Sequence, residues 1–565
     1  MRGRVVCAAA LVLTAAPALA DTLVDNVNGM SVARDGSVTR FTGLVVGKDG
    51  KIVQLLKRND KRPRTDYRVD EAGRSVIPGM IDSHVNLMDL GFTALTLDLS
   101  GIHSLIEAQA KIAEYASKFP DRAWIVGRGW DQSDWGLSHM PTAAQLDAAV
   151  SDRPVWLTSR DGHAGWANSK ALALAGITAA TTDPAGGRIE RGAGGKAPAG
   201  VLVDQAMALV EARVPPPRPE DRDLAFATAQ DILLKHGVTA VGDMGITIED
   251  WQAYRRAGDA DKLLIRIMAY ASDVDNMALI GGPGPTPWLY DDRLRLDGLA
   301  LRLDGALGSH GAWLKAPYAD NAKSTGLQRL DSTQLRNLMS RAAIDNFQVA
   351  VEANGDAAAA DVLGAIEENA QTYKGDRRWR VEHAGVVDAA DVARFGKDGA
   401  VVSMLPAAVA EHAMAEARLG PSRLGDAYPW KSIAASGAHL AFGSGAPAEE
   451  PDPLAGIATA ITREDSAGQP FGGWQSQEAV SREQAFAAYT SGAAYAGFAD
   501  GRFGEIAPGQ RADFVVLEKD PLLAGPDELR KMKPTEVWIG GRQVFGPAER
   551  FLLGNEDDRQ NEKGR

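Results

Sequence analysis

The amino-acid sequence predicts an α/β protein: a (β/α)₈ barrel of the TIM type, with a small β-sandwich domain built from both chain ends and an insertion in the barrel. Two observations lead to this prediction. Both ends of the chain carry β-rich runs with glycine-containing turns, and the region between them alternates short β-branched runs with alanine-rich segments of helical period. Such alternation is typical of parallel βα units, and over about 400 residues it favours one barrel over several unrelated domains.

The β-rich chain ends are the first element of this prediction. Residues 41–54 contain two β-rich runs around the turn sequence KDG, which suits a hairpin. Residues 504–521 and 535–545 contain further strand-like runs with glycine turns. We therefore expect one domain assembled from both ends. The expected boundaries are 21–77 with 497–565 for the β-sandwich domain and 78–496 for the barrel.

The barrel and its insertion are expected between these ends. Residues 237–245 and 347–356 are strand-like, and the alanine-rich run at 357–370 has helical period. The segment from about 102 to 230 is richer in Gly, Pro and Trp and is expected to be the insertion, lying over one face of the barrel. Its tryptophans at 130, 135 and 166 suit either a pocket wall or a buried core, and we expect at least two of them to be structural.

The first twenty residues have the pattern of a signal peptide. Arg2 and Arg4 precede an apolar run that ends in the small-residue sequence ALA at 18–20. We expect cleavage before Asp21, export of the protein to the bacterial periplasm, and no transmembrane anchor after cleavage. A membrane anchor is the alternative, although the apolar stretch is short for a bilayer span.

Composition narrows the class of protein. With 45% hydrophobic and 24% charged residues the chain is typical of globular proteins. The formal net charge of -13 argues against a nucleic-acid partner, because such proteins gather Lys and Arg to neutralise phosphates. The single cysteine, Cys7, lies in the predicted signal peptide, so the mature chain has no disulfide, thiolate nucleophile or cysteine-ligated zinc.

Eight motifs occur in the order found in a known family. The first, VIPGMIDSHVN at 76–86, resembles the first barrel strand of the amidohydrolase superfamily, where the pattern is P-G-x-I-D-x-H-x-H. The rest resemble its N-substituted formamide deformylase-like branch: GRGWDQSDW (127–135), RDGHAGWANSKAL (160–172), DPAGGRI (183–189), RLDGALGSHGA (302–312), RVEHAG (380–385), LAFGSGAP (440–447) and GEIAPGQRADFVVL (504–517). The resemblance implies a site at the carboxyl ends of the barrel strands and a hydrolase acting on amide or formamide C–N bonds.

The same resemblance implies that the metal centre is depleted. Family members use one or two divalent metals to activate water and polarise a carbonyl, with a strand-end aspartate as proton shuttle. Of the six corresponding positions, only His84 and His383 keep the family residue. The others hold Asn86 for a histidine, Ala300 for the bridging lysine, Glu352 for a histidine and Gly445 for the aspartate.

Conventional binuclear hydrolysis is therefore not expected, and no cofactor is expected either. Asparagine is a poor zinc ligand, and the side chains of alanine and glycine cannot ligate at all. A single divalent ion such as zinc, held by His84, Glu352 and His383, stays open, since zinc accepts three protein ligands plus water. Even then the family's general base would be missing.

Arg302 suggests a different arrangement. It lies two residues beyond Ala300 and should face the same side of its strand, toward the barrel mouth. The hypothesis is that Arg302 pairs with Glu352 and replaces the divalent ion by a permanent cation, which suits carboxylate or phosphate ligands. The alternative is an outward-facing surface arginine.

Three further residues complete the candidate set. His163 is a substrate contact or a histidine that caps or packs a helix, and Asp304 touches substrate or orients its strand-end loop. His310 stands where the family commonly has arginine, so it offers a pH-dependent contact or is a solvated loop residue. The candidate substrate-binding residues are His84, Asn86, His163, Arg302, Asp304, His310, Glu352 and His383.

Three functions stay open at this point. The first is a diverged hydrolase for an amide, formamide or other C–N bond, with one metal or with none. The second is a non-catalytic barrel that binds a small organic molecule. The third is a partner subunit of an intact paralogue, and homo-oligomers are equally open. Whether the protein is an enzyme is thus not decided by its motifs.

Overall fold

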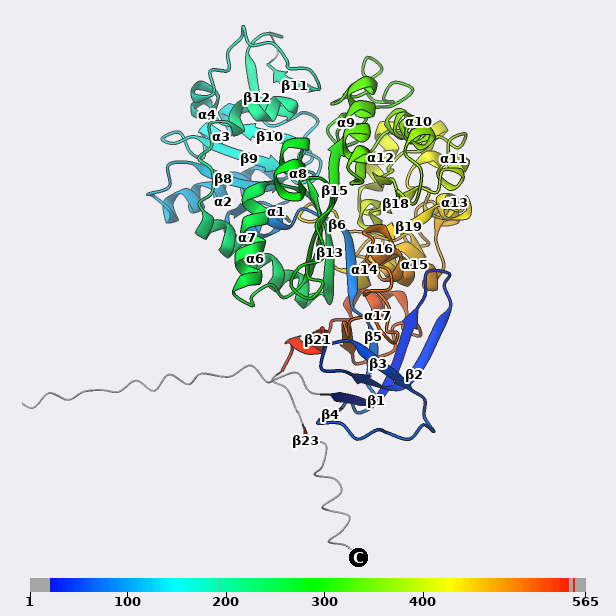
Figure 1. The fold of residues 1–565 in the computed structure, drawn as a ribbon. Helices are drawn as coiled ribbons and strands as arrows, with labels where there is room; N and C mark the ends of the chain where they lie inside the picture. The colour runs from blue at the N-terminus through cyan, green and yellow to red at the C-terminus, as the bar shows by residue number, and fades with distance from the viewer. Residues whose placement is uncertain (1–20, 193, 548–551, 554–565) are drawn as a thin grey trace, which may run out of the picture.

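The computed structural model describes residues 21–192, 194–547 and 552–553. Its centre is an α/β barrel of eight parallel strands, and neighbouring strands pair in the order β19-β18-β17-β16-β15-β14-β13-β6 (Figure 1). The predicted α/β barrel is therefore confirmed. The strands are β6 (Met80–Val85), β13 (Val238–Ile246), β14 (Arg266–Ala271), β15 (Leu294–Arg302), β16 (Gln348–Ala353), β17 (Arg380–His383), β18 (Val401–Met404) and β19 (His439–Phe442).

The barrel is nearly closed between its first and last strands. Two backbone hydrogen bonds join the segments just beyond β6 and β19: Asn86 N donates to Ala446 O at 2.8 Å, and Gly445 N donates to His84 O at 2.9 Å. This contact brings the histidine of the first strand next to the motif that follows the last strand.

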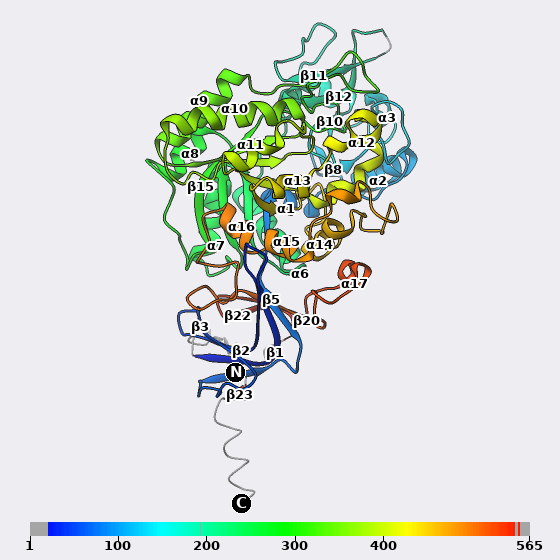
Figure 2. The same cartoon turned by 90° about the vertical axis from the view of Figure 1, so that its right-hand side faces the viewer.

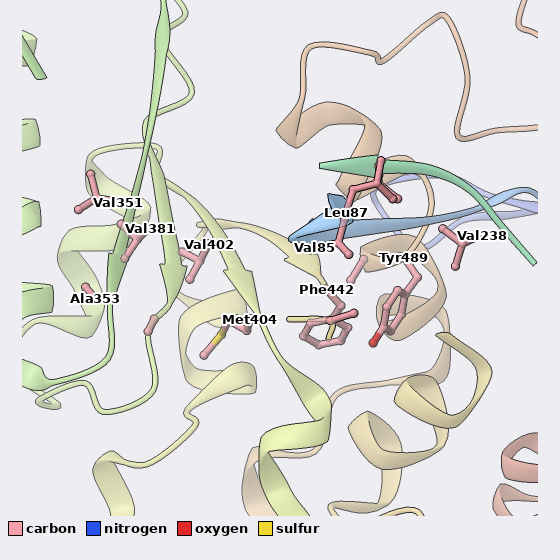
Figure 3. Packing of buried hydrophobic residues seen from close by; sticks show 14 of the residues in the cluster. Val85, Leu87, Val238, Val351, Ala353, Val381, Val402, Met404, Phe442 and Tyr489 are labelled. Atoms are coloured by element: carbon pink, nitrogen blue, oxygen red, sulfur yellow. The ribbon is translucent and has the colours of Figure 1, made fainter. Parts of the chain in front are cut away.

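Helices cover the outside of the barrel because alternate strand residues point outward and are apolar. Val351, Val381, Val402 and Phe442 belong to one buried cluster with residues of these helices (Figure 3). The helices are α1 (Leu87–Leu95), α6 (Pro219–Lys235), α7 (Ile248–Asp259), α8 (Val274–Gly281), α9 (Ser332–Ile344), α10 (Asp356–Thr372), α11 (Val392–Lys397), α12 (His412–Leu419), α13 (Trp430–Ala435), α14 (Pro453–Thr462) and α15 (Arg482–Ala488).

Local capping sets where these helices begin. At α9, the Asp331 carboxylate accepts hydrogen bonds from the backbone N–H groups of Thr333 and Gln334, and the Gln334 side chain accepts one from Asp331 N. Such a capping arrangement satisfies donors that have no partner within the helix. The same logic operates at α7, which begins after Thr247.

The amino end of the barrel is closed by α16 (Ser491–Ala496). Ala493, Ala494 and Ala496 pack among strand residues that face the barrel interior, including Ile81 and Ala350. In addition, the Gln348 side chain donates to Ala496 O at 2.9 Å. The opposite end of the barrel, at the carboxyl ends of the strands, is not covered by α16 and holds the candidate site.

A second sheet lies between β6 and α6 in the chain and beside the barrel in space (Figure 1). Its strand order is β11-β12-β10-β9-β8-β7. Trp130, Trp135 and Trp166 are at most 7% exposed and pack together, with ring centroids 5.7–6.4 Å apart. The elements are β7 (Leu97–Asp98), α2 (Leu105–Lys118), β8 (Ile125–Trp130), α3 (Ala143–Asp147), β9 (Val155–Ser159), β10 (Ala164–Ala167), α4 (Ser169–Leu174), β11 (Gly187–Arg191), β12 (Pro198–Asp204) and α5 (Ala208–Glu211).

The two chain ends form a third sheet, of nine strands, at one end of the molecule (Figure 2). Its central contact joins β5 to β20, with Ser75 opposite Leu517, and β2 and β3 form the hairpin predicted around the KDG turn. The strands are β1 (Thr22–Val32), β2 (Val38–Val46), β3 (Ile52–Leu56), β4 (Tyr67–Asp70), β5 (Ser75–Pro78), β20 (Phe514–Leu517), β21 (Glu536–Ile539), β22 (Arg542–Phe545) and β23 (Leu552–Leu553), with α17 (Pro526–Lys531) between β20 and β21.

The predicted signal peptide falls on residues 1–20, which lie outside the described residues. Among the helices that the structure describes, none is both long enough and apolar enough to cross a bilayer.

Candidate functional site

Two adjoining cavities lie at the carboxyl ends of the barrel strands. The larger has a volume of about 600 Å³ and the smaller about 140 Å³. Both are lined by His84, Asn86, Arg302 and Glu352, so they meet where the family places its metals. We call this region the barrel mouth.

Strand register brings these side chains together. β15 and β16 pair with Arg302 opposite Glu352, and β16 and β17 pair with Ala353 opposite His383. Side chains at the ends of neighbouring parallel strands share one edge of the sheet, so Arg302, Glu352 and His383 gather at the mouth. The Arg302 side chain is 46% exposed there, and an outward-facing surface position is excluded.

Glu352 lies in a chain of alternating charges, which we call the ion-pair chain. Its Oε2 is 3.3 Å from Arg302 Nε, and its Oε1 is 3.2 Å from His163 Nε2. His163 Nδ1 contacts Asp204 Oδ1 at 2.7 Å, and Arg329 donates to the same oxygen at 2.8 Å. The order is thus Arg302, Glu352, His163, Asp204, Arg329, and the predicted pairing of Arg302 with Glu352 is present.

The ion-pair chain fixes the protonation of its members. Burial would raise the pKa of Glu352, but the positive charges around it and the hydrogen bond with His163 hold that pKa well below its usual range. Burial would lower the pKa of His163, but hydrogen bonds to Asp204 and Glu352 raise it to about 10. The Glu352 carboxylate is therefore ionised at neutral pH and faces two cations, an imidazolium and a guanidinium.

His84 belongs to a second buried network, the interior chain, which runs along the inside of the barrel. His84 Nδ1 contacts Glu382 Oε2 at 2.8 Å, and Glu382 Oε1 accepts from Arg380 at 2.7 Å. Arg380 also donates to Tyr270 Oη at 2.8 Å, and Tyr270 donates to Gln348 Oε1 at 2.7 Å. Burial raises the pKa of Glu382, but the Arg380 charge and His84 outweigh it and lower that pKa to about 2.

His383 differs from His163, whose two ring nitrogens both contact carboxylates. Asn354 Nδ2 donates to Glu352 Oε1 at 3.0 Å, so Asn354 Oδ1 accepts from His383 Nδ1 at 2.9 Å. His383 Nε2 is buried and has no hydrogen-bond partner among the described residues. Burial lowers the pKa of His383 to about 4, so the ring is neutral with its Nε2 lone pair available. The residue has a φ of 69°, a strained conformation typical of functional positions.

Three other predicted positions are placed differently. Asn86 lines the mouth, but its amide donates to Met244 O at 2.6 Å. Asp304 lines neither mouth cavity; its buried carboxylate accepts from three backbone N–H groups and so holds the loops beyond β15 and β16 together. His310 also lines neither cavity and contacts Asp320 Oδ1 at 3.1 Å.

Several residues of the site were missed at the sequence level. Asn354 lies two residues beyond Glu352, so strand spacing was a usable signal for it, whereas Glu382 directly precedes His383 and strand alternation would place it on the opposite face. Asp204 and Arg329 had no such signal, because they come from β12 and from the loop before α9.

The residues present do not fit a divalent metal. Glu352 already contacts two cations, and it lies 3.6 Å from His383 Nδ1, while the free lone pair of that ring is on Nε2. His84 and His383 approach with ring centroids 4.7 Å apart. Within the described ranges, no group of three His, Cys, Asp or Glu side chains is arranged to hold a metal ion.

Comparison with known proteins places this site in a family. The model of the amidohydrolase family matches residues 69–545. The chain is 33% identical over 499 residues to Protein LONG AFTER FAR-RED 3 of Arabidopsis thaliana, covering 84% of this chain and 83% of that protein. It is 32% identical over 506 residues to Putative amidohydrolase YtcJ of Bacillus subtilis (87% and 93% covered), and 27% identical over 500 residues to N-substituted formamide deformylase of Arthrobacter pascens (84% and 89% covered).

A solved structure has the same architecture. The uncharacterized metal-dependent hydrolase from Pyrococcus furiosus superposes with a TM-score of 0.68 at 26% identity, covering 89% of this chain and all of that chain. The family match spans the barrel, the second sheet and strands β5, β20, β21 and β22 of the sheet of the chain ends. The chain therefore belongs to the amidohydrolase family, with most of the family's metal-ligand positions substituted.

Proposed function

We propose that this protein is a remodelled amidohydrolase, which binds a small organic molecule in the barrel mouth and hydrolyses an amide or formamide C–N bond without a divalent metal. The observation that carries the proposal is the Arg302–Glu352 ion pair at 3.3 Å, which puts a permanent cation where the family puts its metals. The cavity of about 600 Å³ beside this pair falls in the size range of small-molecule sites.

Arg302 supplies the charge that acts on the carbonyl oxygen. Its Nε faces Glu352, while its Nη atoms make no hydrogen bond to any described residue. Those Nη donors line the mouth and can bind a substrate carbonyl oxygen, whose negative charge grows as a nucleophile adds. Glu352 orients the guanidinium, and His163 on its other side keeps the carboxylate ionised.

His383 supplies the proton transfers. Asn354 fixes the tautomer, so Nε2 can accept a proton from water as the water oxygen bonds to the carbonyl carbon. The C–N bond then breaks, and His383 returns the proton to the departing nitrogen, which leaves as an amine while the acyl part leaves as a carboxylic acid. A positioned base of this kind contributes roughly 10²–10⁴-fold in rate.

The test combines metal content with hydrolysis of amide and formamide panels before and after exhaustive chelation. Arg302→Met should lower kcat/KM by about 10²–10³-fold, the usual effect of removing one donor to an oxyanion. Arg542→Met is the matched control, because Arg542 is 40% exposed and pairs with Asp261 on the surface. One tightly bound metal per chain, with activity lost on its removal, would overturn the metal-free mechanism.

A second candidate is a barrel that binds its ligand without turnover. Two observations favour it: Gly445 stands where the family has its catalytic aspartate, and a pKa of about 4 makes His383 a weak base. A ligand of such a protein raises Tm as the ligand concentration increases, and the ligand is recovered unchanged. Product formation in the same samples distinguishes the two candidates.

Domain division and export are proposals as well. The nine-stranded sheet has a hydrophobic cluster of its own, including Val24, Phe41, Phe514 and Trp538, which supports a small β-sandwich domain made by both chain ends. The Arg-rich start and the ALA sequence at 18–20 support cleavage before Asp21 and a periplasmic location. N-terminal sequencing of protein recovered from the periplasm tests both the cleavage and the location.

A further inference from the structure

We propose that the amino end of the barrel holds a second small-molecule site, which binds a small hydroxycarboxylate. A cavity of about 290 Å³ lies there, lined by Arg295, Asp297, Gln348, Lys374 and Arg377 among others. It shares no lining residue with the two mouth cavities. Asp297 and Arg302 lie on the same strand, five residues or roughly 16 Å apart, so the two sites are at opposite ends of the barrel.

Asp297 is the first half of this site. It is 1% exposed, and neither carboxylate oxygen has a hydrogen-bond partner among the described residues. Arg295 Nε lies 3.0 Å from Oδ1 and balances the charge, but it donates its hydrogen bond to Thr286 O at 3.2 Å. Burial raises the pKa of Asp297 to about 7, and a ligand that supplies O–H groups would stabilise its ionised form.

The backbone aims Asp297 into the cavity. Between β14 and β15 the register shifts, with Ala269 opposite Leu296 and Tyr270 opposite Gly298, so Asp297 is the extra residue of a bulge. Bulges redirect side chains and are frequent beside functional sites. A regular strand would place this position differently.

Arg377 and Lys374 form the second half. Arg377 donates through Nη1 to Ala343 O and to Asn346 Oδ1, but its buried Nε has no partner in the described part of the chain. Lys374 is exposed at the rim, and the nearby Asp376 already pairs with Arg378 at 3.0 Å. The cavity therefore offers unpaired acceptors at one side and a free guanidinium donor with an ammonium at the other.

The charges of the lining select an anion. Arg295, Lys374 and Arg377 are cationic and Asp376 is anionic, while Asp297 has a pKa of about 7, so the lining keeps at least one positive charge in excess. A carboxylate on Arg377 and Lys374 with hydroxyl groups on Asp297 satisfies both halves at once. The small volume restricts the ligand to a few carbon atoms, and glycerate is the probe of choice.

The experiment is calorimetric titration of the full mature protein with glycerate, with propionate and glycerol as matched probes. Propionate keeps the carboxylate and lacks the hydroxyls, whereas glycerol keeps the hydroxyls and lacks the carboxylate. We expect glycerate to bind at least tenfold more tightly than either. Equal binding of the three, or no binding of glycerate, overturns the proposal.

Variants locate the site. Asp297→Asn and Arg377→Met should each weaken glycerate binding about tenfold or more, the usual effect of losing a charge-assisted hydrogen bond. Lys374 is exposed, so Lys374→Ala tests the cationic end, which binds the carboxylate, without threatening the fold. Arg302→Met in the mouth should leave glycerate binding unchanged. Wild-type affinity in all three site variants, or its loss in Arg302→Met, places glycerate elsewhere, independently of whether the mouth is catalytic.

Discussion

Individual residues of the ion-pair chain balance the buried charge of Glu352 with the charges of Arg302 and His163. The family's metal positions offer neutral or anionic ligands to a divalent cation, whereas here the Glu352 carboxylate contacts Arg302 at 3.3 Å and His163 at 3.2 Å. A buried carboxylate of this kind needs paired cations, because an unpaired buried charge is strongly unfavourable. In this protein the charge of Glu352 is thus balanced by Arg302 and His163.

The protonation of His163 predicts how the stability of the protein depends on pH. Its pKa is about 10 in the folded protein, above the ordinary histidine value near 6.5. The folded state therefore binds this proton more tightly, and the stability it contributes is fully present below about pH 6.5 and is lost as the pH rises toward 10.

We accordingly expect the free energy of unfolding to fall more steeply above neutral pH in the wild type than in His163→Gln. Urea-induced unfolding across that pH range measures the difference. His236, whose pKa is raised to about 9, contributes equally to both proteins and cancels in the comparison. Parallel slopes would show that His163 is not held protonated by the ion-pair chain.

The barrel strands bring the residues of the site together through close contacts between neighbouring strands, such as β15 and β16. Gly298 of β15 pairs with Gln348 of β16, and a methyl group at Gly298 would come within 2.1 Å of Gln348 O. The backbones of β15 and β16 cannot move apart at this point without disturbing the pairing that places Arg302 beside Glu352.

Gly298→Ala should therefore destabilise the protein by about 1–3 kcal/mol, the usual cost of overpacking. Gly425→Ala is the control, because an added methyl group there meets nothing within 4 Å, and a change within about 0.5 kcal/mol is expected. Chemical denaturation of both variants measures the difference. A Gly298→Ala variant as stable as the control would mean that β15 and β16 separate easily.

The elements also show what could be predicted from the sequence. Spacing along one strand placed Arg302 on the same side as Ala300, and the motifs at the ends of β16 and β17 gave Glu352 and His383. The partner of His163 could not be predicted, because Asp204 lies 41 residues away at the end of β12, in the second sheet. Asp297 was missed as well, because a bulge depends on two strands and has no signature in either alone.

The whole molecule depends on contacts between the barrel and the sheet of the chain ends. Arg266 begins β14 and is 1% exposed, and its Nη2 donates to Asp513 Oδ1 at 2.7 Å. Asp513 directly precedes β20, so this buried ion pair ties the barrel to the last part of the chain.

Asp513→Ala should lower the free energy of unfolding by about 3–5 kcal/mol, because it leaves the Arg266 charge buried without its partner. Asp527→Ala is the control; that carboxylate pairs with Arg530 but is 87% exposed, and such surface pairs contribute at most about 1 kcal/mol. Thermal and urea unfolding of the two variants provide the measurement. Equal stability would show that the barrel does not rely on this pair.

The pairing of β5 with β20 joins the two ends of the chain, and it forms late during synthesis. β5 ends at Pro78 and β20 begins at Phe514, so more than 400 residues must be synthesised between the two halves. Until then β5 has an open edge, and an open strand edge invites pairing with other chains. Because β20 comes so late in the chain, the nine-stranded sheet is completed only after the last strands have been synthesised.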